Sequence, residues 1–136
     1  MITKSQIIPI LLDASPSFQA FLNDPMERGN VERIYNLLGD FTLYLLKLDE
    51  GNRAIEFPAV ARALERFIQD GDQEAKNIAI IGLLENLQNV WANNQVDPEQ
   101  FASHLLPEGR KWWNELNAFW RGERRYVGEG IEPRIV

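Results

Sequence analysis

The segment DQEAKNIAIIGLLENLQNVWANN, residues 72–94, decides the fold class of this chain. Asp72 has the type and position of a helix N-cap, and the apolar residues that follow lie around almost the whole circumference of the predicted helix. A helix of this kind is buried among other elements instead of lying on a surface. We therefore expect residues 72–94 to form the central helix of an all-helical domain.

Helix start and stop signals divide the rest of the chain into further helices. Pro9 is expected to kink or shorten the first of them, or to move its start later. None of the segments shows the apolar–polar alternation of a β-strand. The expected helices begin at Thr3 and at Ser15-Pro16, cover 31–50 and 57–70, run from Asp97 through Leu105, and run from Leu106 to about Arg121.

Gly71 leaves only a tight turn between the helix over 57–70 and the helix over 72–94. So short a connection predicts an antiparallel helix pair. The Gly-Asp turn ahead of an apolar helix resembles the entry to the second helix of HEAT-type repeats. At 136 residues the chain suits one domain. We expect an all-α, single-domain bundle of about six helices with HEAT-like antiparallel pairs over residues 1–122, followed by an irregular tail over 123–136.

Composition excludes several classes of protein. Apolar residues make up 45% of the chain and charged residues 25%, which is ordinary for a globular protein. The chain has no cysteine, which excludes disulfides and thiol catalysis. Its N-terminus is a poor signal peptide, and no window approaches the roughly 18 apolar residues that span a bilayer. We expect a cytoplasmic protein without membrane association.

The net charge of −6 is unevenly distributed. Residues 1–109 carry 16 acidic and 8 basic side chains, a net charge of −8, whereas residues 110–136 carry 4 acidic and 6 basic side chains, a net charge of +2. An acidic body repels nucleic acid and is compatible with a basic protein partner. Tryptophans beside arginines in the C-terminal part are typical of single-strand binding. Because the acidic body repels nucleic acid, we interpret these tryptophans as residues that pack in the core, and we expect no nucleic-acid partner.

No constellation of catalytic or metal-binding residues is found. His104 is the only histidine, whereas zinc sites usually require several His or Cys ligands. The chain contains no P-loop, no dinucleotide-binding glycine motif and no nucleophile elbow. The sequence therefore predicts neither an enzyme nor a cofactor or metal site.

Two groups of polar residues are candidates for partner binding. The first group lies near predicted helix ends, where carboxylates also stabilise helix dipoles. The second forms a polar stripe on the helix over 72–94, where it either hydrogen-bonds a neighbouring loop or lines a binding groove. The first group is Asp49, Glu50, Asp70, Asp72 and Glu74, and the second is Glu85, Asn86, Gln88 and Asn89.

Adjacent tryptophans in the last predicted helix indicate two different environments. Trp112 and Trp113 cannot point the same way on a helix, so one is expected in the core and the other at an edge or interface. Trp113 or Trp120 at a dimer interface would make the chain a self-associating structural protein.

Four short motifs resemble those of a family of small, acidic, all-helical bacterial proteins of uncharacterised function. They are PILL at 9–12, EFP at 56–58, GLLENLQN at 82–89 and WW at 112–113. The resemblance covers most of the chain and implies an all-helical fold without an established activity. In size and acidity the members are similar to immunity proteins, which neutralise toxins by binding them.

The expected function is that of a non-catalytic protein-binding module, in its most specific form an immunity protein that neutralises a basic toxin domain by direct binding. One alternative is a small-ligand binder or enzyme that uses Glu85 with Asn86, Gln88 or Asn89 in a pocket. The other is the self-associating protein described above. The sequence leaves the identity of the partner and the oligomeric state open.

Overall fold

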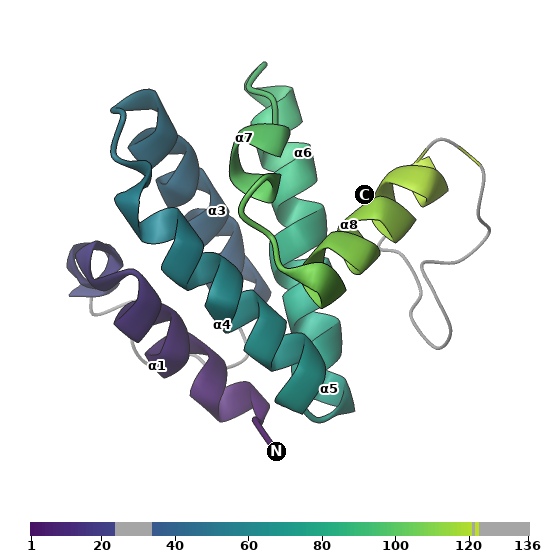
Figure 1. Ribbon diagram of the computed structural model, residues 1–136. Helices are drawn as coiled ribbons and strands as arrows, with labels where there is room; N and C mark the ends of the chain where they lie inside the picture. The colour runs from purple at the N-terminus through teal and green to yellow at the C-terminus, as the bar shows by residue number, and fades with distance from the viewer. Residues whose placement is uncertain (24–33, 121, 123–136) are drawn as a thin grey trace.

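The computed structural model describes residues 1–23, 34–120 and 122, and these residues form helices joined by short connections (Figure 1). The predicted single-domain, all-α bundle of about six helices is confirmed. The boundary predicted between a domain ending at 122 and a tail over 123–136 lies outside the described residues. The α-helices are α1 (Lys4–Ala14), α3 (Ile34–Glu50), α4 (Phe57–Asp70), α5 (Gln73–Asn77), α6 (Asn86–Asn93), α7 (Glu99–Ala102) and α8 (Pro107–Trp120).

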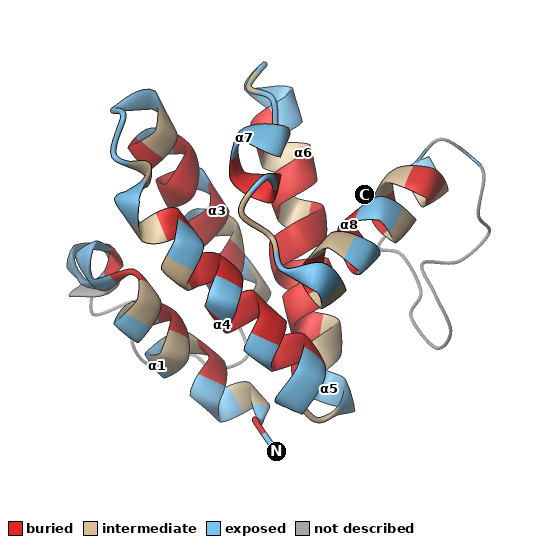
Figure 2. Ribbon diagram, viewed as in Figure 1, coloured by how far each residue is buried: buried red, intermediate tan, exposed pale blue. Residues whose placement is uncertain are grey.

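The helix predicted over 72–94 is the centre of the bundle. Asp72 caps it, with its Oδ1 accepting a hydrogen bond from the Ala75 N–H at 2.8 Å. Helix α5 continues through a π-helical segment, Ile78–Glu85, into α6 without interruption. Helices α3, α4 and α8 all contact the π-helical segment, and all eight of its residues are buried (Figure 2). The central position predicted for this helix is confirmed.

The π-helical segment displaces the polar stripe expected on the central helix. Its i→i+5 hydrogen bonds widen each turn, so residues along it no longer follow a wheel of 3.6 residues per turn. Glu85, which belongs to the expected polar stripe, is buried and only 3% exposed. The expected stripe is therefore wrong at this position.

Gly82 brings the central helix close to α3. A Cβ atom at this position would lie 2.7 Å from Leu38 Cδ1 and 3.3 Å from the Tyr35 ring. A separation below 3.0 Å requires one of the two groups to move. Because Gly82 has no side chain, the central helix and α3 can pack closely against each other at this position.

Two helical segments of the described N-terminal part contain a proline, one inside the helix and one at its start. Helix α1 begins after Thr3, whose N–H donates to Gln6 Oε1 at 2.8 Å, and it continues through Pro9 to Ala14. Pro9 therefore neither delays the start of α1 nor ends it. The start signal at Ser15-Pro16 opens a 3₁₀-helix, Pro16–Asn23, rather than an α-helix.

An aromatic cluster fills the core between α3, α4, α6 and α7. Trp91 is fully buried, and its ring centroid lies 6.2 Å from that of Phe57 and 6.4 Å from that of Phe101. Its indole Nε1 donates to the backbone carbonyl of Thr42 at 3.0 Å. One side chain therefore joins four helices through packing and one buried hydrogen bond.

A parallel β-bridge between Ile2 and Gly71 attaches the N-terminus to the turn between α4 and α5. The Ile2 N–H donates to the Asp70 carbonyl, and the Asp72 N–H donates to the Ile2 carbonyl, both at 2.8 Å. Helix α4 runs antiparallel to the helix that follows this turn, as predicted (Figure 1).

Within the described ranges, no helix combines the length and apolar character required to cross a membrane.

Candidate binding pocket between helices α6, α7 and α8

A buried carboxylate positions the start of α8. Glu65 of α4 is only 8% exposed, and its two carboxylate oxygens accept hydrogen bonds from the backbone N–H groups of Gly109, at 2.8 Å, and Glu108, at 3.1 Å. These groups belong to the first turn of α8, where the helix leaves N–H donors unsatisfied and carries partial positive charge. A side chain from another helix thus provides the N-terminal cap of α8.

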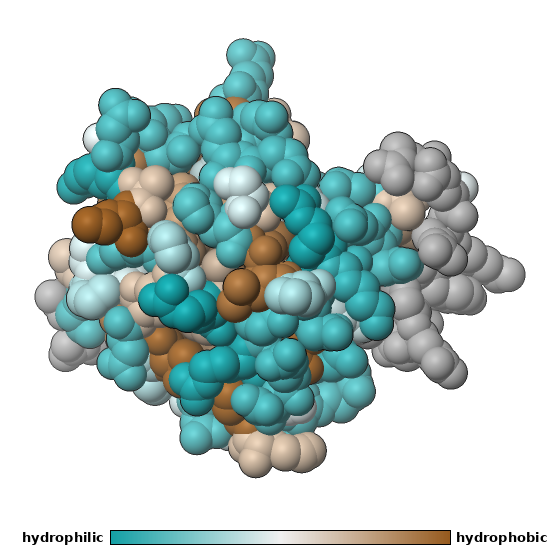
Figure 3. Space-filling view, in the orientation of Figure 1, coloured by the Kyte–Doolittle hydropathy of each residue, from teal (hydrophilic) through white to brown (hydrophobic). Residues whose placement is uncertain are grey.

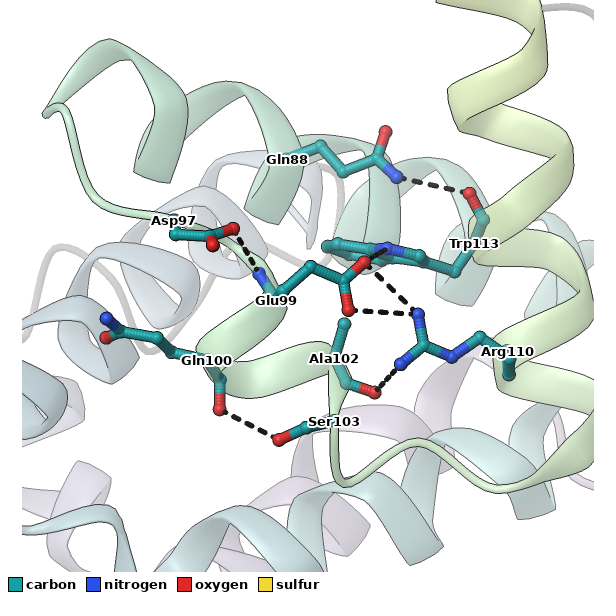
Figure 4. A network of polar contacts seen from close by, with 8 residues as sticks. All are labelled: Gln88, Asp97, Glu99, Gln100, Ala102, Ser103, Arg110 and Trp113. Atoms are coloured by element: carbon teal, nitrogen blue, oxygen red, sulfur yellow. Dashed lines mark hydrogen bonds and ion pairs between the residues drawn. The ribbon is translucent and has the colours of Figure 1, made fainter.

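Glu99 joins α7 to α8 (Figure 4). Its carboxylate oxygens lie 3.1 and 3.2 Å from Arg110 Nη1, and Oε1 also accepts from Trp113 Nε1 at 3.0 Å. Arg110 Nη2 donates to the Ala102 carbonyl at 2.9 Å, at the end of α7. Asp97 holds the start of α7, because its Oδ1 accepts from the Glu99 N–H at 2.9 Å. Four residues therefore hold the short helix α7 against α8.

Gln88 reaches from α6 to α8 in the same region. Its side chain is only 6% exposed, and Nε2 donates to the Trp113 carbonyl at 3.3 Å. Its Oε1 is buried and has no hydrogen-bond partner among the described residues. Figure 4 shows this oxygen on the side of the amide that is turned away from Trp113. Since an unsatisfied buried acceptor costs about 1–3 kcal/mol, Gln88 Oε1 is a candidate contact for a ligand.

An open pocket of about 320 Å³ lies where these three helices meet. Two carboxylates, three amides and two indoles contribute to its lining, and none of the described residues in the lining is a lysine or an arginine. Such a surface accepts hydrogen bonds and presents aromatic faces, so it can bind a group that is positively charged and rich in N–H donors. The lining residues are Gln88, Asn89, Ala92, Asp97, Pro98, Glu99, Trp113, Asn117 and Trp120.

The five acids predicted at helix ends do not form a single patch. Asp49 and Glu50 end α3, close to the start of α4, whereas the other three lie at the turn between α4 and α5. The 14 residues of α4 separate the two groups by about 20 Å (Figure 1). The acids at the far turn are Asp70, Asp72 and Glu74.

Two of these acids have structural roles in the bundle. The Asp49 carboxylate lies at hydrogen-bonding distance from the side-chain amide of Gln100. With its amide nitrogen turned toward Asp49, Gln100 donates to this carboxylate and connects the end of α3 to α7. Asp72 caps α5, as described above. The remaining three carboxylates, of Glu50, Asp70 and Glu74, are exposed.

The four residues of the predicted stripe divide between the core and the pocket. Gln88 and Asn89 line the pocket, whereas Glu85 and Asn86 do not. Asn86 is half-buried, and its Nδ2 donates to the Gly82 carbonyl one turn earlier at 2.9 Å. Glu85, which the ligand-binding alternative combines with one of the three amides, therefore does not line this pocket.

Sequence reasoning missed the other half of the pocket. In the sequence, Asp97 indicates only the start of a helix, and no motif distinguishes Glu99 or Asn117 as a candidate site residue. Residues 113, 117 and 120 have the spacing of one helix face, which is a local signal that α8 contributes a wall. No local signal shows that this face lies opposite Gln88.

The two adjacent tryptophans are both buried. Trp113 is 1% exposed and bonded to Glu99, and Trp112 is 7% exposed with Lys76 Nζ 5.1 Å from the ring centroid. The expectation that one of them lies at an edge or interface is therefore wrong. Trp120, at 46% exposed, is the tryptophan of α8 that faces solvent.

His104 is half-buried, and its ring centroid lies 6.0 Å from that of Phe57.

These features define an all-α domain whose candidate site is a pocket of hydrogen-bond acceptors and indoles. Across the described segments, no group of three or more His, Cys, Asp or Glu side chains is arranged to hold a metal ion. The chain belongs to the domain-of-unknown-function family DUF7674, whose model matches residues 8–121. No curated protein and no solved structure matches the chain. The family match agrees with the resemblance to an uncharacterised family found from the four sequence motifs.

Proposed function

We propose that this chain is a non-catalytic protein-binding module that binds a basic protein at the pocket between α6, α7 and α8. The observation that supports the proposal most strongly is the composition of the pocket. Its lining combines two carboxylates with a buried unsatisfied acceptor, and it includes no basic side chain among the residues that the structure describes. The surrounding chain has the same sign of charge, because residues 1–109 carry a net charge of −8.

The distribution of charge and apolar surface supports a binding mode based on polar contacts. Hydrophilic side chains cover most of the face shown in Figure 3, and apolar side chains form only small, separate patches on it. The exposed acids at the two ends of α4 lie too far apart to contact one small epitope together, but both add to the negative field. Such a field accelerates association with a basic partner, while a few buried anchors provide most of the affinity.

An immunity protein that neutralises a basic toxin domain in the cytoplasm is the most specific form of this proposal. The proposal is supported by the small size of the chain, its acidic body and its preformed pocket of hydrogen-bond acceptors. Direct neutralisation of a toxin requires tight binding and no catalysis. The proposal requires no cofactor, membrane or nucleic acid.

The two alternatives have less support. A catalytic or small-ligand site built on Glu85 would need that carboxylate in the pocket, and it does not contribute to the lining. Self-association through Trp113 would need an accessible indole, and this one is buried and bonded to Glu99. Trp120 is accessible, but it is also part of the proposed binding pocket.

Co-expression with the products of neighbouring genes tests the proposal. We expect a stable complex with a basic product, and we expect its association rate to fall steeply between about 0.05 and 0.5 M salt because the charges on both surfaces are screened. Stopped-flow tryptophan fluorescence measures this rate. Recovery of no complex, or an association rate that does not change with salt, would contradict the proposal.

A further inference from the structure

We propose that the pocket between α6, α7 and α8 receives the guanidinium group of an arginine side chain from the partner. The inference rests on the proposed function and identifies the chemical group that enters the pocket. It depends on three features of the lining: its charge, its unsatisfied acceptor and its exposed indole.

The charges of the lining select a cation. Among the described residues of the lining, only Asp97 and Glu99 are charged, and both are acids. The nearby Arg110 does not offset them both, because its guanidinium is already bonded to Glu99 and to the Ala102 carbonyl. Asp97 uses Oδ1 to cap α7, which leaves Oδ2 for a ligand. An anion in this pocket would face the Asp97 carboxylate, which has no ion-pair partner among the described residues.

The unsatisfied acceptor favours a ligand that carries hydrogen-bond donors. Gln88 Oε1 is buried and lacks a hydrogen bond, while Nε2 of the same amide is fixed by the Trp113 carbonyl. The amide therefore cannot satisfy the oxygen by rotating without losing its existing bond. A guanidinium carries five N–H donors in one plane, so it can donate to more than one acceptor of the lining at the same time.

The exposed indole favours arginine over lysine. Trp120 lines the pocket with nearly half of its surface accessible, and the edge-to-face contact with Phe119, at 5.1 Å between ring centroids, supports its ring. A planar, weakly hydrated guanidinium stacks on an aromatic face better than a compact, strongly hydrated ammonium does. The pocket therefore combines an aromatic face for stacking with acceptors for the N–H groups.

Titration of the full-length protein with N-acetyl-arginine amide, monitored by NMR, tests this inference. The matched control compound is N-acetyl-citrulline amide, which has nearly the same shape but no charge. We expect the arginine compound to shift the indole N–H signal of Trp120 and the side-chain amide signal of Gln88, with saturation at millimolar concentrations. The citrulline compound should bind at least about fivefold more weakly, because it lacks the charge-assisted hydrogen bonds.

Three variants and one control locate the binding site. Asp97→Asn, Gln88→Leu and Trp120→Ala should each weaken binding of the arginine compound by about fivefold or more. Asp13→Asn, which removes an exposed acid on α1, should leave it unchanged. Trp120 and Asp97 are exposed, so their variants remain informative if Gln88→Leu does not fold. Equal shifts with both compounds, no shifts at these signals, or equal affinity in Asp97→Asn and Trp120→Ala would overturn the inference.

Titration with free arginine distinguishes a protein side chain from a small metabolite as the source of the guanidinium. A pocket for a side chain should bind the blocked compound at least as well as free arginine, since the backbone atoms remain outside. Binding of free arginine alone would overturn the inference in favour of a metabolite. A partner complex that is unaffected by Asp97→Asn and Trp120→Ala would also overturn it while leaving the proposed function intact. Arginine binding without any partner complex would count against the proposed function alone.

Discussion

Trp91→Ala is expected to lower the free energy of unfolding by about 3–5 kcal/mol, the largest effect of any substitution considered. The variant loses a fully buried indole that packs between Phe57 and Phe101, and it leaves a cavity that these side chains can fill only in part. It also leaves the Thr42 carbonyl without the indole N–H that it accepts. Urea denaturation followed by circular dichroism at the helix band measures the change.

Trp120→Ala is the matched control for this substitution, because it removes the same side chain from an exposed position. We expect it to lower the free energy of unfolding by less than about 1 kcal/mol. Equal losses in the two variants would show that the aromatic cluster around Trp91 does not form the core described above.

Glu65→Ala is expected to lower the free energy of unfolding by about 2–3 kcal/mol. The substitution removes the carboxylate that accepts the N–H groups of Glu108 and Gly109, and it leaves both donors without a partner at the start of α8. Thermal denaturation and urea denaturation both measure the loss. Because α8 forms one wall of the pocket, binding of N-acetyl-arginine amide should weaken in this variant as well.

Two variants distinguish a capping role for Glu65 from a general effect of charge. Glu65→Gln retains an oxygen acceptor and should lose about half as much stability as Glu65→Ala, while Glu50→Ala removes an exposed acid and should change stability by less than about 0.5 kcal/mol. An equal response to Glu65→Ala and Glu50→Ala would show that Glu65 does not cap α8.

Helix limits could be predicted where the signal is local. The limits of α4 agree with those expected for residues 57–70, and Asp72 and Thr3 act at the helix starts assigned to them. A cap and the first turn that it serves lie within three or four residues of each other, so the sequence contains all the information. The burial of the central helix could also be predicted locally, because apolar residues lie around almost its whole circumference.

Tertiary contacts decided the features that could not be predicted. The π-helical segment, Ile78–Glu85, packs against three other helices. A helical wheel assumes the same angle between all successive residues, so it cannot represent a π-helical segment within an α-helix. Ser15, placed as a simple helix cap, donates through Oγ to Glu56 at 2.6 Å, a contact across 41 residues. A 3₁₀-helix follows it instead of the expected α-helix.

The candidate site was predictable only in part because its residues come from three helices. The predicted polar stripe includes Gln88 and Asn89, which line the pocket, but helical periodicity alone does not show which other helix faces them. Asp97 and Trp120 join them only through the packing of α7 and α8 against the central helix. The five acids at helix ends were chosen by residue type, and the length of α4 separates them.

Hydrogen–deuterium exchange of the co-purified complex with its basic partner tests the central claim most directly. The account predicts that binding slows exchange in residues 95–106, which contain α7 and its exposed flanks, and in the part of α8 around Asn117, while α1 and the turn between α4 and α5 remain unchanged. Slower exchange confined to α1 or to that turn, with no change around α7, would contradict it.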